Sequence, residues 1–212
     1  MKKLLLIVSI LTFSFALKAQ EEGSALINAY GSYNFPDKVN IDNGYFQIPS
    51  GFQWGVGLEV FAVKNKSIEL KYLRESTHFP LYSDAGIPVE YSNSDKGSLN
   101  YILLGGTNYF GKNPDSKVLP YAGLEAGLGL VSREYTNWRF AWGGKLGVKI
   151  KTSSAISVNL NTFFQSVISA FGADYIPVYP GSGAAYAVPS YLAIFQFGVG
   201  AVISVDLAKT KR

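Results

Sequence analysis

The 212-residue sequence contains no cysteine and only one histidine. Without cysteine, neither a disulfide framework nor a lipid-anchored cysteine is available. Metal binding is poorly supported as well, because there is no thiolate, no second imidazole and no loop with acids at alternate positions. Beyond the first twenty positions no run of about 20 apolar residues occurs, which excludes a helical membrane protein. We therefore expect no cofactor or metal.

The sequence also has little excess of one charge sign over the other. The 19 basic residues include Lys2, Lys3 and Lys18 in the first twenty positions, and without these three the chain has 16 basic and 15 acidic residues. Three more bases lie within the last four positions. The body of the chain thus has no basic face, and nucleic-acid binding is excluded.

What the sequence does contain begins with an export signal. Two lysines precede an apolar core, Leu4–Leu17, which is followed by Lys-Ala-Gln at 18–20. This pattern predicts a signal peptide at 1–19. We expect one barrel domain over 20–207 and a short basic tail at 208–212.

Eight segments show the period-two alternation of β-strands: 24–35, 51–63, 67–79, 96–110, 120–132, 139–151, 155–169 and 190–206. Short connections at 64–66, 111–117 and 152–154 alternate with longer ones, the modest exception being the link near Arg133–Trp138. This rhythm is typical of outer-membrane barrels, whose turns are periplasmic and whose longer loops are external. It predicts an all-β, eight-stranded, antiparallel up-and-down transmembrane β-barrel with both termini in the periplasm.

Glycine indicates which face of each strand lies inside. In the stretch Tyr121–Leu130 one face is aliphatic, while the other carries only Tyr121, Glu125 and glycines. A glycine facing solvent weakens a strand and gains nothing, whereas in a narrow lumen it leaves room for long side chains. We therefore expect the apolar faces to contact lipid. The departures from alternation are Leu26, Ile102 and Leu104.

The same parity predicts two aromatic girdles and a buried ionic network. The girdles would contain Trp54, Tyr101, Phe140, Trp142 and Tyr191 at the external end and Tyr109 and Phe110 at the other. Because an unpaired charge in the lumen is costly, we expect Glu125 to face Lys145 and Glu59 to face Lys71. The whole predicted network is Glu59, Glu69, Lys71, Glu75, Glu125, Lys145 and Lys149. Its role would be structural, with a gated ion or proton path as the alternative.

The signal peptide, the eight strands, the short turns and the Tyr-Ala-Gly-x-x-Ala-Gly-x-Gly strand together resemble the small OmpA/OmpX/OmpW-type outer-membrane barrels. The Ala19-Gln20 junction resembles exported proteins of the Bacteroidota. The resemblance implies a monomer held in outer-membrane lipid and inserted by the barrel assembly machinery, which reads a terminal aromatic. Here the last strand ends at Val205-Asp-Leu207, so Leu207 or the internal Phe195 and Phe197 would serve instead.

Other chemistry is weakly supported. Ser76 and His78 beside Glu75 suggest a barrel lipid hydrolase, but residues two apart on a strand are about 7 Å apart, too far for a nucleophile–base hydrogen bond. We expect no enzyme. The glycines of 123–129 lie inside a strand with no helix after it, so they are not a dinucleotide motif. Tyr175, Tyr179 and Tyr186 in the last long loop are candidate surface contacts.

Three functions remain open. The first is an outer-membrane barrel with a closed, charge-filled lumen and a structural or loop-binding role. The second is an OmpW-like conduit for small hydrophobic molecules, which needs a lumen open from outside and a lateral exit. The third is a soluble periplasmic lipocalin-like binder, in which the two faces of every strand are inverted.

Overall fold

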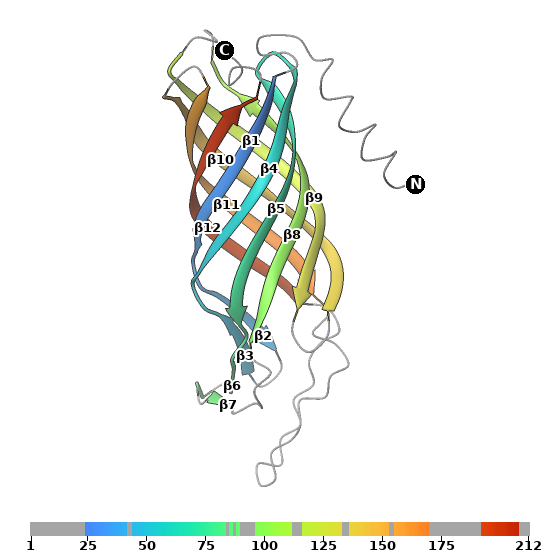
Figure 1. Ribbon diagram of the computed structural model, residues 1–212. Helices are drawn as coiled ribbons and strands as arrows, with labels where there is room; N and C mark the ends of the chain where they lie inside the picture. Colours follow the sequence, from blue (N-terminus) through green and yellow to red (C-terminus); the bar gives the residue numbers. More distant parts are fainter. Residues whose placement is uncertain are drawn as a thin grey trace, which may run out of the picture.

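The computed structural model of the chain is a closed antiparallel barrel (Figure 1). It describes residues 24–41, 44–83, 85–86, 88–89, 96–111, 116–132, 136–152, 155–169 and 192–207. The predicted signal peptide and basic tail lie outside the described residues. The barrel strands are β1 (Ala25–Asn34), β4 (Gly51–Val63), β5 (Lys66–His78), β8 (Lys96–Tyr109), β9 (Val118–Ser132), β10 (Thr136–Lys151), β11 (Ile156–Ser169) and β12 (Leu192–Asp206).

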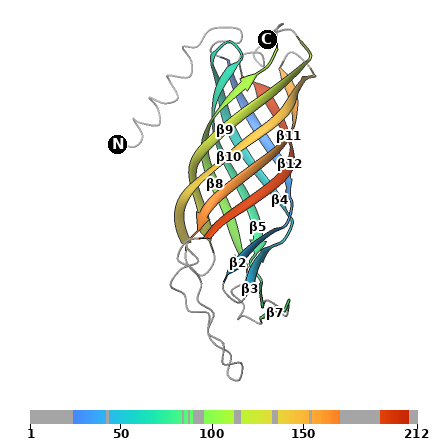
Figure 2. The same cartoon turned by 180° about the vertical axis from the view of Figure 1, so that it is seen from behind.

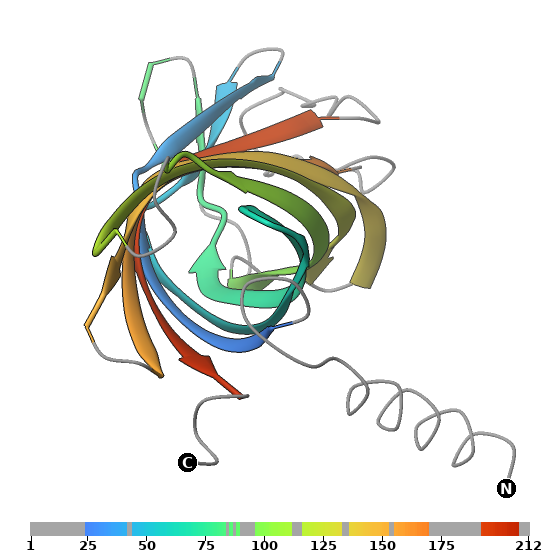
Figure 3. The ribbon, with the colours of Figure 1, turned by 90° about the horizontal axis from the view of Figure 1, so that it is seen from above.

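Each barrel strand pairs with its neighbours along the chain, and β1 pairs with both β4 and β12 to close the ring. The closed ring is visible in the view along the barrel (Figure 3). Within the described residues, no helix is long and apolar enough to cross a membrane. The predicted all-β fold and its eight strands are confirmed.

The two ends of the barrel differ (Figures 1 and 2). One end carries the short connections, including Lys64–Asn65, together with the start of β1 and the end of β12; we call it the turn end. The other carries a second sheet of four short strands, β2 (Asp37–Ile41), β3 (Gly44–Ile48), β6 (Leu81–Ser83) and β7 (Pro88–Val89). We call this the cap sheet and this end the cap end. It was not predicted.

The faces of the barrel strands lie as the glycine pattern predicts. Trp54, Trp142 and Phe197 are exposed on the outside, at 49%, 39% and 59% of their surface, whereas Glu125 is buried at 6%. The glycines of the other face are buried or partly buried, with Gly123 and Gly143 among the buried ones. Apolar side chains therefore cover the outer surface, which is the arrangement of a barrel in lipid and the reverse of a soluble one.

An apolar core fills the cap half of the interior. Phe46 and Ile48 of β3 and Phe79, which follows β5, pack with inward-facing residues of the barrel wall. These wall residues are Leu73, Leu99, Tyr101, Leu103, Val131, Ala141, Val167 and Ile194. The cap sheet thus inserts part of its apolar face into the barrel mouth, and the two sheets share one core.

This core explains where alternation fails in β8. Leu99, Tyr101 and Leu103 are apolar because they face the core, while Ile102 and Leu104 are apolar because they face outward. The prediction that Tyr101 belongs to the outer girdle is therefore wrong, since its ring is 1% exposed. Phe110, Phe140 and Trp142 are exposed, as the girdles require. Tyr191 lies outside the described residues.

Candidate functional site in the barrel interior

The turn half of the interior is mostly polar and charged, beside a small buried cluster of Tyr109, Leu119 and Tyr121. Alternation along four strands directs Glu59, Glu69, Lys71, Glu125, Lys145 and Lys149 inward, and each of them except Lys145 is at most 6% exposed as a residue. The Lys145 side chain is 10% exposed. Burying charge is costly unless the charges are paired and hydrogen-bonded. The contacts in this half of the barrel are therefore what allows the strands to close.

Two ion pairs cross this half of the barrel. Lys71 Nζ lies 2.8 Å from Glu125 Oε2, and Lys145 Nζ lies 2.7 Å from Glu69 Oε2. Both pairs join strands that are not neighbours, β5 with β9 and β5 with β10. Side chains can meet in this way only across a narrow interior, which is what an eight-stranded barrel provides.

Glycine makes the crossing possible. Gly105 lies directly between Glu69 and Glu125 in the register of β5, β8 and β9. A β-carbon at Gly105 would approach the Glu125 Cβ to 2.8 Å, and one at Gly123 would approach the Lys145 Cε to 2.9 Å. Both distances are shorter than van der Waals contact, so larger residues at these two positions would displace the ion-paired side chains.

The predicted partners of these charges were wrong. Glu125 is opposite Gly143 rather than Lys145, and Glu59 is opposite Glu69 rather than Lys71. Both hairpins are shifted by two residues, which keeps every side chain on its predicted face. Between β4 and β5 the turn has two residues, with Asn65 at φ 63°. A bulge between Phe61 and Val63 supplies the rest of the two-residue shift in register. Between β9 and β10, Ser132 pairs with Thr136.

A shell of hydrogen-bond donors surrounds Glu59 and Glu69. Ser67, Tyr109 and Asn28 donate to Glu59, at 2.5, 2.7 and 3.2 Å. Tyr30 and Asn28 also donate to Glu69. None of these donors was predicted, and Tyr109 was wrongly assigned to the outer girdle. Tyr109 is two residues after Thr107 on the same strand, so both side chains point to the same face, and Thr107 is also buried. This spacing is the signal that identifies Tyr109 as inward-facing.

Lys149 and Glu75 are buried but lie apart from the two ion pairs. Lys149 Nζ is 5.2 Å from the ring centre of Phe61 and 5.1 Å from that of Tyr109, within the range of cation–π contact. Glu75 accepts hydrogen bonds from Asn34 and Gln196, each 2.6 Å long. The structure therefore brings four of the seven predicted residues into ion pairs and attaches Glu59 to them by shared donors.

Glu75 belongs to a group of amide side chains that lies beside the apolar core. Tyr101 donates to Gln196 at 2.7 Å, and Gln53 and Gln165 exchange hydrogen bonds of 3.2 and 3.3 Å. Glu75 itself is fully buried, and no cation of the described residues lies within ion-pair distance of it. The interior thus has ion pairs in its turn half and, toward the cap end, amide groups beside an apolar core.

The other predicted contacts are accounted for briefly. Ser76 and His78 are both exposed near the end of β5. Tyr175, Tyr179 and Tyr186 lie outside the described residues. In the part of the chain that the structure describes, no group of three or more His, Cys, Asp or Glu residues could hold a metal ion.

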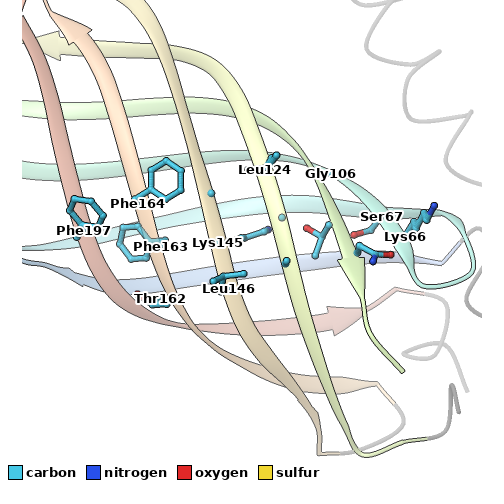
Figure 4. A pocket seen from close by; sticks show the side chains of 15 residues that line it. Lys66, Ser67, Gly106, Leu124, Lys145, Leu146, Thr162, Phe163, Phe164 and Phe197 are labelled. Atoms are coloured by element: carbon cyan, nitrogen blue, oxygen red, sulfur yellow. The ribbon is translucent and has the colours of Figure 1, made fainter. Parts of the chain in front are cut away.

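A groove of about 900 Å³, lined mostly by outward-facing residues, lies across β5 and β8 to β12 (Figure 4). Small residues of the outward rows, Gly106, Ala122 and Gly144, alternate with the larger Leu124 and Phe164. Among the outward-facing lining residues only Lys66, Asn108 and Thr162 are polar. Such a surface suits hydrocarbon chains.

Comparison with known proteins gives a match in structure alone. No family model and no curated protein sequence match the chain. The barrel is similar to the crystal structure of Neisserial surface protein A (NspA), with a TM-score of 0.55 and 14% identity over 86% of this chain and 97% of that one.

It is equally similar to the outer membrane protein OprG from Pseudomonas aeruginosa, with a TM-score of 0.55 and 12% identity. That match covers 84% of this chain and 95% of OprG. At these identities the likeness is one of fold. The chain therefore has the fold of the closed eight-stranded outer-membrane barrels.

Proposed function

We propose that the chain is an integral outer-membrane protein whose barrel is closed by its own side chains. Its role is structural, or consists of binding through the segments at the cap end, rather than transport. The fold likeness to OprG and NspA supports the membrane setting. So does the exposure of apolar side chains around the barrel, for example Leu124 at 72% and Leu146 at 60%, which would be unfavourable in water.

The observation that carries the closed barrel is the continuous filling of the interior. Two buried ion pairs lie in the turn half, and toward the cap end glutamine and glutamate side chains lie beside the core shared with the cap sheet. A conducting pore needs a continuous wet path, which larger barrels provide and an eight-stranded barrel filled with side chains does not.

The conduit alternative receives less support. It requires a lumen open at the cap end, where Phe46, Phe79 and Leu99 are each at most 1% exposed. The groove is lined mostly by outward-facing residues, so we interpret it as a surface that contacts lipid chains rather than as a lateral exit from the lumen. A soluble carrier requires inverted faces and conflicts with the exposed Trp54, Trp142 and Phe197.

The remaining parts of the proposal concern setting and partners. The turn end, with both termini, would face the periplasm, and the cap end would face outward, as in barrels with short periplasmic turns. The partners would be outer-membrane lipid and, during insertion, the barrel assembly machinery. We propose a monomer without enzymatic activity, because its buried ionisable groups are engaged in contacts inside the barrel.

Planar-bilayer recording of the purified, folded protein tests the closed barrel. Folding is first checked by heat-modifiable migration on gels, which reports a barrel that resists unheated detergent. The expected result is a folded band without stepwise conductance. Reproducible conductance steps from folded protein would overturn the closed barrel in favour of the conduit.

A further inference from the structure

The outward face of β5 carries two cations separated by apolar residues. Its outward side chains run Lys66, Ile68, Leu70, Tyr72 and Arg74. Eight residues of strand cover about 26 Å, or about 20 Å along the axis of a barrel whose strands tilt by about 40°. Since the apolar band of such barrels is about 25 Å tall, Lys66 and Arg74 lie near its opposite edges.

Arg74 is held on the barrel surface by a small polar seat. Asn100, its partner on β8, accepts hydrogen bonds from the Tyr72 hydroxyl at 2.8 Å and from Arg74 Nη1 at 3.3 Å. Asn100 in turn donates to Ser98 at 3.0 Å. Asn100 and Ser98 are buried although they are on the outward face, so this seat is part of the wall.

Aromatic side chains flank the seat on both sides. Trp54 pairs with Arg74 across β4 and β5 and packs edge-on against Tyr72, and it is 49% exposed. Trp138, 53% exposed, is two strands beyond Asn100 in the same row, opposite Leu130. Tryptophans at this level are typical of the boundary between hydrocarbon and headgroups.

The charge of Arg74 is not balanced within the described part of the chain. A guanidinium group has five N–H donors, and the structure gives it one acceptor, the neutral Asn100 oxygen. The ion pairs Lys71–Glu125 and Lys145–Glu69 lie inside the barrel. A cation at the edge of hydrocarbon is costly unless an anion or water meets it, and phosphate is the anion that a guanidinium binds with two parallel hydrogen bonds.

We propose that Arg74, seated on Asn100 and flanked by Tyr72 and Trp54, binds the phosphate group of a lipid in the outer leaflet. The proposal rests on the proposed function, because it needs the barrel in a membrane with its cap end outward. A lipid phosphate fits better than a free ion, since Trp54 and Leu130 in the same row offer apolar contact beside the charge.

The test compares lipid binding by the folded protein in a nonionic, phosphate-free detergent, with native mass spectrometry as the readout. The probes are diphosphoryl lipid A, the same glycolipid without its phosphates, and inorganic phosphate as a competitor. Arg74→Gln removes the charge, and Arg74→Lys keeps the charge without the planar fork. Lys66→Gln is the matched control, since it removes the other outward cation of the same strand.

We expect Arg74→Gln to weaken binding of diphosphoryl lipid A about tenfold, Arg74→Lys by less, and Lys66→Gln less than about twofold. The dephosphorylated lipid should not distinguish wild type from Arg74→Gln, and excess inorganic phosphate should not displace bound lipid A. Equal lipid A binding by folded wild type and folded Arg74→Gln would overturn the site. Displacement by inorganic phosphate would overturn the lipid as its ligand.

Failure of the proposed function gives a different result. If wild type shows no heat-modifiable folded band in this detergent, the outer-membrane barrel itself is contradicted. A folded band without dependence on Arg74 contradicts only the phosphate site.

Discussion

Glu69 is the carboxylate on which the interior contacts converge. It accepts hydrogen bonds from Asn28 and Tyr30 and forms an ion pair of 2.7 Å with Lys145, while only 2% of it is exposed. Removing a buried carboxylate from water costs several kcal/mol, and this cost is offset only when its partners remain in place. Glu69 therefore contributes to stability through the whole group rather than through one bond.

Glu69→Gln should destabilise the folded barrel strongly. The amide keeps one oxygen for Asn28 and Tyr30 but leaves the Lys145 ammonium without its counter-charge in the interior. We expect the free energy of unfolding to fall by about 3–5 kcal/mol, the usual cost of removing one partner of a buried pair. Urea unfolding in lipid vesicles, followed by tryptophan fluorescence, measures this change.

The control replaces both partners, Glu69→Leu with Lys145→Met. Because no charge is then left unpaired, the double variant should lose less stability than Glu69→Gln alone. Unfolding of Glu69→Gln at the wild-type urea concentration would contradict the ion pair as a stabilising contact.

At the scale of elements, the cap sheet is joined to the barrel through β2 and β3, whose Val39, Phe46 and Ile48 lie in the shared core. β3 directs Phe46 and Ile48 into the shared core and Tyr45 to the other side, where its ring stacks on Tyr82 at 5.1 Å. Lys38 Nζ lies 3.5 Å from the centre of the Tyr45 ring. Neighbouring residues of β3 thus contact two different surfaces, the shared core and the outer side of the cap sheet. Single substitutions can therefore test the two contacts separately.

Phe46→Ala should loosen the cap, whereas Tyr45→Ala should not. Truncating a fully buried phenylalanine costs about 3–5 kcal/mol, while a partly exposed aromatic stack contributes about 1 kcal/mol. We expect the same difference in urea unfolding and an increase in protease cleavage within 37–48 for Phe46→Ala only. Equal losses in the two variants would indicate that the cap does not share the barrel core.

The elements also show what sequence alone can predict. The eight long strands were identifiable because one face contacts lipid along 10 to 16 residues, so alternation persists long enough to be read. β2, β3, β6 and β7 have two to five residues each, too few for a reliable period. The inward direction of Glu69 and Lys145 followed from parity, which depends on the local strand only.

The ion-pair partners of these inward-facing charges were not predictable in the same way. They depend on hairpin register, which the bulge after Phe61 and the tight turn at Asn65 shift by two residues. They depend also on closure of the barrel, which brings β5 opposite β9 and β10. Tyr101 was misplaced for a related reason, because an apolar stretch of lumen exists only once the cap sheet supplies Phe46 and the segment after β5 supplies Phe79.

At the scale of the whole molecule, the two ends differ enough to be distinguished chemically. Asn40 of β2 is exposed on the cap sheet, and Lys117 is exposed beside the start of β9 at the turn end. The proposed orientation places Asn40 outside the cell and Lys117 in the periplasm. Since the chain has no cysteine, a single introduced thiol gives an unambiguous label at either position.

We expect Asn40→Cys to react with a membrane-impermeant maleimide on intact cells, and Lys117→Cys to react only after the outer membrane is permeabilised. Both side chains are exposed in the folded protein, so a difference in labelling reports the membrane rather than burial. Urea-denatured samples of both variants provide the control for thiol reactivity. Labelling of Lys117→Cys but not Asn40→Cys on intact cells would reverse the orientation, and equal labelling of both would contradict a barrel that crosses the outer membrane.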